Sequence, residues 1–394
     1  SDRANYDWAV AVNRQCLVMI GLWPRNTFGR RRLLENLYVM TIALMIIGFL
    51  AIPSFRLLMK QQEYISIIDN FGLPIAFTSI ILKIFVLHAK RNVLVPVINM
   101  IAEDWAKPKT DEERDVMFRY ARIARVVSIF SFTSGVVSIT LMIVLPKFGI
   151  HIRHTTNGLD VFPVPAYYVH EVPETPYFEI TYVAQCIMLW VMLFCYCGID
   201  MFFGTVILHI CGQVENLRVR IENEKKFRNF KELLAMIVTD HIRLSSSLQY
   251  LLRVVDTIEN TFTPILFAVM LFFGVITCMY ITGIIFMFAE KGTLSVTRLC
   301  FLAFTLCGSS IHMSLYFIAG QTLVNESEAI YNAAYECGWI NLKSNEVRSL
   351  ILVMAKSKKP LYVTAGKLFP MTMLTFANIT KICFSYLSLL VTWL

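Results

Sequence analysis

Residues 183–208 read VAQCIMLWVMLFCYCGIDMFFGTVIL and contain a single formal charge, Asp200. A helix needs about 20 mostly apolar residues to cross the hydrocarbon core of a bilayer, and this stretch exceeds that length. Six further apolar stretches lie at 37–53, 72–88, 126–145, 264–289, 299–319 and 371–394. The only formal charges within all seven are Lys83, Asp200 and Lys381. The sequence therefore predicts an all-α membrane protein with seven transmembrane helices.

The composition supports this class. Hydrophobic residues make up 56% of the chain and charged residues 16%, with a mean hydropathy of +0.59, whereas soluble domains carry about 25% charged residues. Such a chain has too little polar surface to cover itself in water, which excludes a soluble enzyme, a nucleic-acid-binding protein and a disordered scaffold. We expect no cleavable signal peptide, because residues 1–36 are basic and lack a long apolar core.

The distribution of basic residues predicts the orientation. Lys and Arg number six, eight, eight and six in residues 1–36, 89–125, 209–263 and 320–370, against two in each of the three intervening segments. Cytoplasmic segments of membrane proteins are enriched in these residues. We therefore expect a cytoplasmic N-terminus and an extracellular C-terminus. This is the reverse of a G-protein-coupled receptor, whose Asp-Arg-Tyr and Asn-Pro-x-x-Tyr sequences are also missing here.

The loops carry their own patterns. Residues 209–263 and 320–370 alternate polar and apolar residues at helical period, so we expect cytoplasmic helical extensions that form an anchor domain. Lys358-Lys359-Pro360 should end the second of these helices, and Thr364-Ala365-Gly366 should form a turn before the last span. The outer loop 146–182 contains five prolines and is predicted to be an irregular cap over the bundle.

Motifs for catalysis and coupled transport are missing from the sequence. We find no glycine-rich phosphate loop, no Gly-x-Ser-x-Gly and no His-Glu-x-x-His, so neither an enzyme nor a cofactor is predicted. His151 and His154 lack a Cys or carboxylate at ligand spacing, and we expect no metal site. A small-molecule transporter remains an alternative, although the chain has no internal repeat.

Charged residues within membrane spans are functional candidates. Lys83 lies near the cytoplasmic end of its span and could extend its amine to the lipid headgroups. Asp200 lies in the cytoplasmic half of the fourth span, where the sequence favours a pairing or interface role over contact with a substrate.

The last span has two different faces. Asn378, Lys381, Ser385, Ser388 and Thr392 are spaced by three and four residues and form one polar stripe. The opposite face is apolar. Such a stripe lies either at a packing seam of small residues or in the wall of an aqueous pore. A pore would need several subunits, because one helix cannot enclose it. Leu389 and Trp393, one turn apart beside the stripe, are candidates for a hydrophobic gate.

A second candidate site lies in the outer halves of spans two, three, four and six. Aromatic, methionine and small residues gather there, a combination that is typical both of an apolar ligand pocket and of ordinary core packing. The candidate ligand-binding residues are Phe71, Ile75, Ser79, Gly135, Ser138, Met142, Phe178, Tyr182, Phe301, Phe304 and Thr305.

Motifs near both ends resemble those of insect odorant receptors. They cover about 65 residues, and the predicted topology covers the whole chain. The C-terminal motifs are Lys358-Lys359-Pro360-Leu361, Thr364-Ala365-Gly366-Lys367, Phe369-Pro370-Met371, Thr375-Phe376 and Ser385-Tyr386-x-x-Leu389-Leu390, with Ala334-Tyr335 and Trp339 upstream and Gly21-Leu22-Trp23-Pro24 near the N-terminus. The related gustatory receptors have Thr-Tyr and Gln-Phe where this chain has Thr375-Phe376 and Cys383-Phe384. These two departures favour the odorant branch.

The resemblance implies a ligand-gated, non-selective cation channel in the plasma membrane of a sensory neuron dendrite. It implies a heterotetramer with co-receptor subunits, opened by a small volatile hydrophobic ligand. By alignment of the last helix, 371–394, the family's gate falls on Leu389 and Trp393, with Thr392 facing the pore. Ser385 and Ser388 are pore candidates because they belong to the polar stripe. Trp393 is bulkier than the family's usual aliphatic residue, and Lys381 is an unusual residue for a cation path. A gustatory-type or self-sufficient homotetrameric channel is the alternative.

Overall fold

The structure, a computed structural model, describes residues 2–148, 162–168, 176–223, 230–289, 296–336, 351, 354–355 and 357–393. Six helical stretches in this part of the chain are long and apolar enough to cross a membrane. They are Gly29–Lys60, Tyr64–Ala89, Asp111–Phe148, Tyr177–Glu222, Gln249–Phe288 and Val296–Glu336. Each contains most or all of one of the first six predicted spans. The seventh predicted span is the helix α11, Met373–Trp393, which is not among these six.

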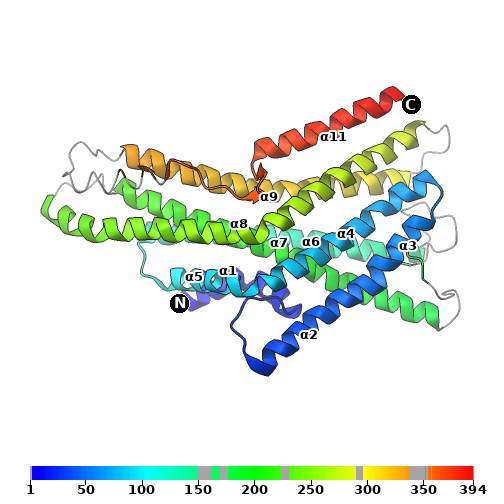
Figure 1. Ribbon diagram of the computed structural model, residues 1–394, viewed down its shortest axis with the longest axis horizontal. Coiled ribbons are helices and arrows are strands. Elements are labelled where there is room, and N and C mark those ends of the chain that lie inside the picture. Colours follow the sequence, from blue (N-terminus) through cyan, green and yellow to red (C-terminus); the bar gives the residue numbers. More distant parts are fainter. Residues whose placement is uncertain are drawn as a thin grey trace.

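The helices are longer than the apolar stretches that predicted them. In chain order they are α1 (Asp2–Met19), α2 (Gly29–Ile46), the π-helix η1 (Ile47–Ala51), α3 (Ile52–Lys60), α4 (Tyr64–Ala89), α5 (Arg91–Ala106), α6 (Asp111–Val144), the 3₁₀ turn η2 (Leu145–Phe148), α7 (Tyr177–Asn223), α8 (Phe230–Ala289), α9 (Val296–Glu336) and α11. The helices of spans four and five thus continue past the apolar stretches, as the periodicity of 209–263 predicted. In Figure 1, α8 and α9 extend to the left well beyond α11.

Pro53 explains the π-helix that interrupts the first span. Its ring has no N–H and clashes with the carbonyl four residues earlier, which belongs to Phe49. The helix widens over Ile47–Ala51, and the Tyr168 hydroxyl donates a hydrogen bond of 3.0 Å to the oxygen of Phe49. The backbone N–H of Tyr167 donates to the oxygen of Pro53 at 3.0 Å. The break in the helix therefore binds a segment of the outer loop.

That outer segment, 162–168, is irregular and largely buried. The side-chain amide of Gln185 on α7 exchanges two hydrogen bonds of 3.0 Å with the backbone of Val164. Gln185 is fully buried, so this pairing satisfies a polar group that α7 would otherwise bury alone. The segment is thus attached to both α7 and the first span.

The hydrophobic core runs between α7 and its neighbours. Phe202, Phe203 and Ile207 of α7 are buried, as are Phe262 of α8 and Phe317 of α9. α1 packs against α7 at Gly198, where an added Cβ would lie 3.2 Å from the Cβ of Cys16. The N-terminal segment is therefore part of the fold. α11 lies along one edge of the bundle, near α8 and α9 (Figure 1).

One element departs from the all-α prediction. Thr364–Ala365 (β1) and Phe369–Pro370 (β2) form a two-stranded antiparallel hairpin. Gly366 and Lys367 at its tip have positive φ angles of 64° and 58°, which fits the predicted turn because glycine adopts this conformation without strain. The predicted helix break is also present, since helical structure ends at Ser357.

Candidate functional site

The hairpin that precedes α11 is bonded to α8 and α9. Thr263 of α8 accepts a hydrogen bond from the N–H of Gly366 at 3.2 Å, and its hydroxyl donates to the oxygen of Thr364 at 3.1 Å. The hydroxyl of Ser327 on α9 accepts from the N–H of Leu361 at 2.9 Å. The base of the last helix is therefore fixed to two spans of its own subunit.

Gly320 allows the base of α11 to approach α9 closely. A Cβ at this position would lie 2.2 Å from the backbone oxygen of Met371, far inside van der Waals contact. Met371 itself is buried, and its N–H donates to the oxygen of Val363 at 2.9 Å. A side chain at position 320 would have to displace the backbone from which α11 starts.

α11 uses one side to pack against the bundle. Cys383 is 3% exposed, and the Phe376 ring lies 5.3 Å from that of Phe317 on α9 and 6.1 Å from that of Phe273 on α8. Asn378, Lys381 and Ser385 are exposed. The described part of the predicted polar stripe thus faces away from its own bundle. The backbone of Ser388, Leu389, Thr392 and Trp393 is helical, but their side chains lie outside the described residues.

A first group of predicted ligand-binding residues lies where the C-terminal end of α6 meets the N-terminal end of α7. The Phe178 ring is 4.9 Å from that of Phe162 in the outer segment and 6.1 Å from that of Tyr182. The amine of Lys147 lies 4.6 Å from the centre of the Tyr182 ring. Met142 on α6 packs half-buried against the core.

A second group lies where α4, α8 and α9 meet. Phe71 and Ile75 are half-buried on α4, beside Gly72, where an added Cβ would lie 2.2 Å from the Tyr280 hydroxyl of α8. Phe301 of α9 packs against a small cluster that contains Tyr280 and Leu302.

The other predicted residues are dispersed. Ser79 is buried on α4, and Gly135 lies against Leu193 at the contact between α6 and α7. Phe304 is 57% exposed on α9. An open cavity of about 400 Å³ lies elsewhere, against η1 and the outer segment. Its lining comprises Thr41, Leu44, Met45, Gly48, Phe49 and Tyr168.

Three hydroxyls among the predicted ligand residues already donate hydrogen bonds. Tyr182 donates to the oxygen of Ile143 at 3.0 Å, Ser138 to that of Ser134 at 2.9 Å, and Thr305 to that of Phe301 at 2.8 Å. A hydroxyl has one proton to donate but keeps lone pairs that can accept. A ligand at these positions would therefore have to donate the hydrogen bond.

The intramembrane charges form a buried network. Lys83 of α4 lies 2.7 and 2.8 Å from the two carboxylate oxygens of Asp200 on α7, and the Nε2 of His312 on α9 lies 2.8 Å from one of them. The Lys83 amine also lies 4.0 Å from the centre of the Tyr196 ring. The possibility that Lys83 reaches the headgroups is wrong, because its side chain is 1% exposed. The pairing role of Asp200 is confirmed.

Sequence reasoning missed two members of such networks. His312 carries no formal charge at neutral pH, so it was not among the charged residues within the spans. Arg298 lies just outside the predicted sixth span, yet it forms a buried ion pair with Asp69 of α4 at 2.9 Å. A histidine within a span and an arginine at its edge were the available signals.

Comparison with known proteins agrees with this architecture. The family profile described as "7tm Odorant receptor" matches residues 63–384. Odorant receptor Or2 of Anopheles gambiae is 22% identical over 393 residues, covering 95% of this chain and 96% of that protein. Odorant receptor 10 of Aedes albopictus is 24% identical over 279 residues, covering 69% of this chain and 68% of that protein.

Solved structures share the fold. The insect olfactory receptor OR5 from Machilis hrabei, in complex with eugenol, superposes with a TM-score of 0.80 over 100% of both chains, at 13% identity. A second structure of OR5 gives a TM-score of 0.80 over 99% of both chains. Because the family profile covers most of the sequence, this multi-pass membrane protein belongs to the insect odorant receptor family, whose members are channel-forming receptors and not enzymes.

Proposed function

We propose that this chain is a subunit of an odorant-gated, non-selective cation channel in which α11 lines a pore shared by several subunits. The observation that carries the proposal is the orientation of α11. Cys383 is buried against α8, where its thiol lies 3.9 Å from the oxygen of Gly274, whereas Asn378, Lys381 and Ser385 are exposed. A polar stripe that faces away from its own bundle needs water or a neighbouring subunit beside it.

The flanks of the stripe support assembly. Ile382, Phe384 and Tyr386 are 69%, 54% and 46% exposed on the described chain. Large apolar side chains next to a polar stripe are suited to contacts with lipid or with adjacent subunits. We propose a heterotetramer with co-receptor subunits, held together by a cytoplasmic anchor domain formed by 209–263 and 320–370. The N-terminus would be cytoplasmic and the C-terminus extracellular, with seven helices crossing the plasma membrane of a sensory dendrite.

The proposed ligand is a small, mostly apolar volatile. OR5, which shares the fold, was solved with eugenol, a ligand of this kind. In this chain the ligand would bury apolar surface among the outer residues of α4, α6, α7 and α9 that the sequence predicted. Because Tyr182, Ser138 and Thr305 already donate to backbone oxygens, selectivity would come from shape and from ligands that donate a hydrogen bond.

The proposed gating step is a population shift. Ligand binding would favour the arrangement in which the α11 helices separate at Leu389 and Trp393. A ligand shifts such an equilibrium only by its difference in affinity for the two states. Weak, shape-based contacts therefore imply that the channel responds to a broad or moderate range of odorants.

Whole-cell recording tests the proposal. The chain would be expressed alone and with a co-receptor, under G-protein blockade, and exposed to an odorant panel. A fast cation current on co-expression is the expected result, and current from the chain alone would indicate a self-sufficient channel. Protein that reaches the surface but gives no current with any odorant would contradict the channel proposal.

A further inference from the structure

Two helices start close together without the usual groups at their N-termini. α2 begins at Gly29 and α5 at Arg91, and neither N-cap residue, Phe28 or Lys90, forms a side-chain capping hydrogen bond. Neither first turn contains an acidic residue. α6 shows the usual arrangement, with a capping box between Thr110 and Glu113 and three acidic residues in its first turn. Because a helix N-terminus carries a partial positive charge, the start of α2 favours an external anion. The N-cap residue of α5, Lys90, is also the residue at which α4 ends, so the contribution of α5 comes from its basic side chains.

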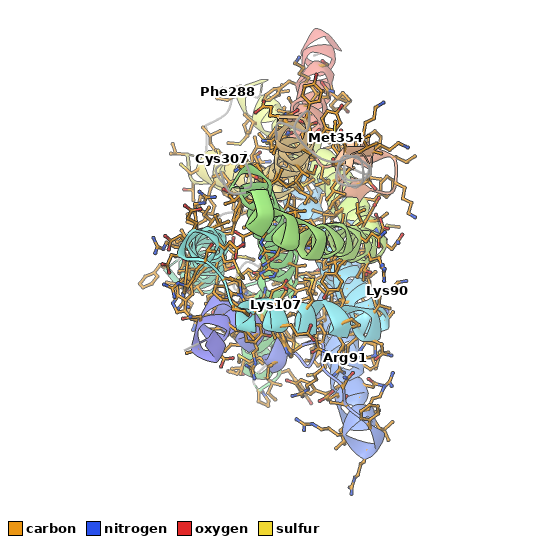
Figure 2. The ribbon with its side chains drawn as sticks, turned by 90° about the vertical axis from the view of Figure 1, so that its left-hand side faces the viewer. Lys90, Arg91, Lys107, Phe288, Cys307 and Met354 are labelled. Carbon is orange, nitrogen blue, oxygen red and sulfur yellow. The ribbon has the colours of Figure 1, made fainter. Side chains whose placement is uncertain are left out.

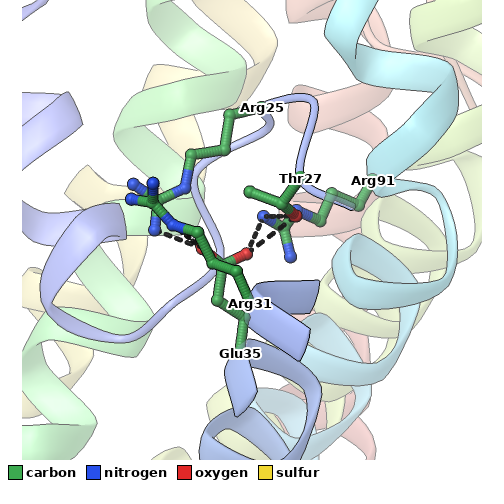
Figure 3. A network of polar contacts seen from close by, with 5 residues as sticks. All are labelled: Arg25, Thr27, Arg31, Glu35 and Arg91. Atoms are coloured by element: carbon green, nitrogen blue, oxygen red, sulfur yellow. Dashed lines mark hydrogen bonds and ion pairs between the residues drawn. The ribbon is translucent and has the colours of Figure 1, made fainter. Parts of the chain in front are cut away.

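Basic side chains strengthen this preference. Residues 25–35 and 88–92 contain one acidic residue, Glu35, and six basic ones: Arg25, Arg30, Arg31, Arg32, Lys90 and Arg91. Glu35 is shared among several of them (Figure 3). Arg25 and Arg91 each pair with a different oxygen of the Glu35 carboxylate. The Nε of Arg31 lies 3.6 Å from the oxygen that pairs with Arg25. One carboxylate therefore leaves this region with a large positive excess.

Two buried donors in the same cluster lack an acceptor. The side chain of Arg91 is 7% exposed, and its Nε has no hydrogen-bond partner among the described residues. The Nε of Arg25 is likewise buried without a partner in that part of the chain. A buried donor without an acceptor is costly. An anion with several oxygens could accept these hydrogen bonds in the fork geometry that arginine provides.

The cluster is open on one side. Gly29 has a φ angle of 58°, and nothing lies within 4 Å of the position a Cβ would take. Arg30, Arg31, Arg32 and Lys90 are exposed. Figure 2 shows Lys90 and Arg91 together at one end of α5. Arg32 and Arg91 both lie near enough to act electrostatically on His88, so basic groups from the start of α2 reach the turn between α4 and α5.

We propose that this cluster binds the headgroup of an anionic phospholipid that carries more than one phosphate. The predicted span 37–53 starts two residues after Glu35, and the span 72–88 ends two residues before Lys90, so the cluster lies at the depth of the lipid headgroups. Basic clusters next to the cytoplasmic end of a span attract such lipids. This assignment rests on the proposed orientation, in which this end of the bundle is cytoplasmic.

The test measures lipid binding by the purified full-length chain in nanodiscs. One set contains phosphatidylcholine with a small fraction of phosphatidylinositol 4,5-bisphosphate, and the other contains phosphatidylcholine with phosphatidylserine at equal total charge. Retention of the bisphosphate lipid is read by native mass spectrometry. The variant R30Q/R31Q/R32Q removes three exposed charges from the cluster. The control R122Q/K358Q/K359Q removes three exposed charges from other segments that are predicted to be cytoplasmic.

The proposal predicts that the chain retains the bisphosphate lipid in preference to phosphatidylserine. Retention of the bisphosphate lipid should fall about tenfold or more in R30Q/R31Q/R32Q and change little in the control variant. Equal losses in both variants would indicate general charge attraction and would overturn the site. Binding of soluble inositol trisphosphate as tight as that of the lipid would overturn the lipid assignment in favour of a free phosphate compound. The assay needs neither odorant nor current, so its failure leaves the channel proposal untouched.

Discussion

The Nζ of Lys83 lies 2.7 and 2.8 Å from the two carboxylate oxygens of Asp200, and the side chains of the pair are 1% and 7% exposed. α4 and α7 are thereby joined by an ion pair within the predicted membrane region, and His312 connects the pair to α9. Three helices that carry predicted ligand residues thus share one buried electrostatic contact.

Removing one partner of this ion pair should destabilise the protein more than removing both partners. Asp200→Leu would leave an unpaired buried ammonium and is expected to cost about 3–5 kcal/mol, whereas the double variant Lys83→Met/Asp200→Leu should recover most of the loss. Apparent unfolding temperatures of the purified proteins measure this. A double variant no more stable than Asp200→Leu would argue against a direct pair.

Gly320→Ala should displace the base of α11. The added methyl would lie 2.2 Å from the oxygen of Met371, and this clash outweighs the roughly 1 kcal/mol that alanine contributes to helix stability. Gly308→Ala on the same helix is the matched control, because nothing lies within 4 Å of its added Cβ. We expect loss of stability and of ligand-evoked current only in Gly320→Ala. Equal behaviour of the two variants would contradict the close contact.

Tyr168→Phe should release the outer segment from the first span. The hydroxyl donates to the oxygen of Phe49 at 3.0 Å and accepts from Gln185 at 2.9 Å, and leaving such groups unsatisfied costs about 1–3 kcal/mol. Hydrogen–deuterium exchange of the peptide covering 162–168 should become faster. Tyr167→Phe is the control, because the hydrogen bond from Tyr167 to the oxygen of Pro53 comes from its backbone N–H. Unchanged exchange in Tyr168→Phe would refute the role of this hydroxyl.

The stabilisation from the contact between Asp104 of α5 and His209 of α7 should depend on pH. Burial alone would raise the pKa of the Asp104 carboxyl, but hydrogen bonds and charges from His209 and Lys107 outweigh this effect and hold the pKa below its usual value. The stabilisation is therefore complete above the unfolded-state pKa of about 3.9 and is lost as the pH falls through the lower folded-state pKa. Asp104→Asn should lower the unfolding temperature at pH 7, and the difference should shrink at more acidic pH. A difference that does not change with pH would contradict this.

Much of the fold could be predicted from local sequence. Each apolar stretch corresponds to a helix because a spanning helix must satisfy its own backbone hydrogen bonds, and the periodicity of 209–263 predicted the continuation of α7 and α8. The hairpin at Thr364–Pro370 and the π-helix before Pro53 were not predicted. Both depend on contacts with distant residues, Thr263 in one case and Tyr168 in the other.

The candidate site was less predictable, because its geometry depends on which helices are neighbours. Lys83, Asp200 and His312 are far apart in the sequence and meet only through packing. Gly135 is a small residue that leaves room in principle, but the Leu193 side chain lies against it in the structure. For α11, by contrast, the spacing of polar residues was enough to predict one polar side of the helix. Asn378, Lys381 and Ser385 on that side are exposed in the structure.

The most direct test of the pore proposal is the accessibility of α11 during gating. Ile379 of α11 is half-buried and packs against the hydrophobic core, so Ile379→Cys is the matched control for Ser385→Cys. Each variant would be expressed with the co-receptor. A charged, water-soluble thiol reagent would then be applied with and without odorant during whole-cell recording. The account predicts that the reagent changes the current of Ser385→Cys, faster when the odorant is present, and leaves that of Ile379→Cys unchanged. Modification of Ile379→Cys alone, or of neither variant while odorant still evokes current, would contradict a pore lined by this face of α11.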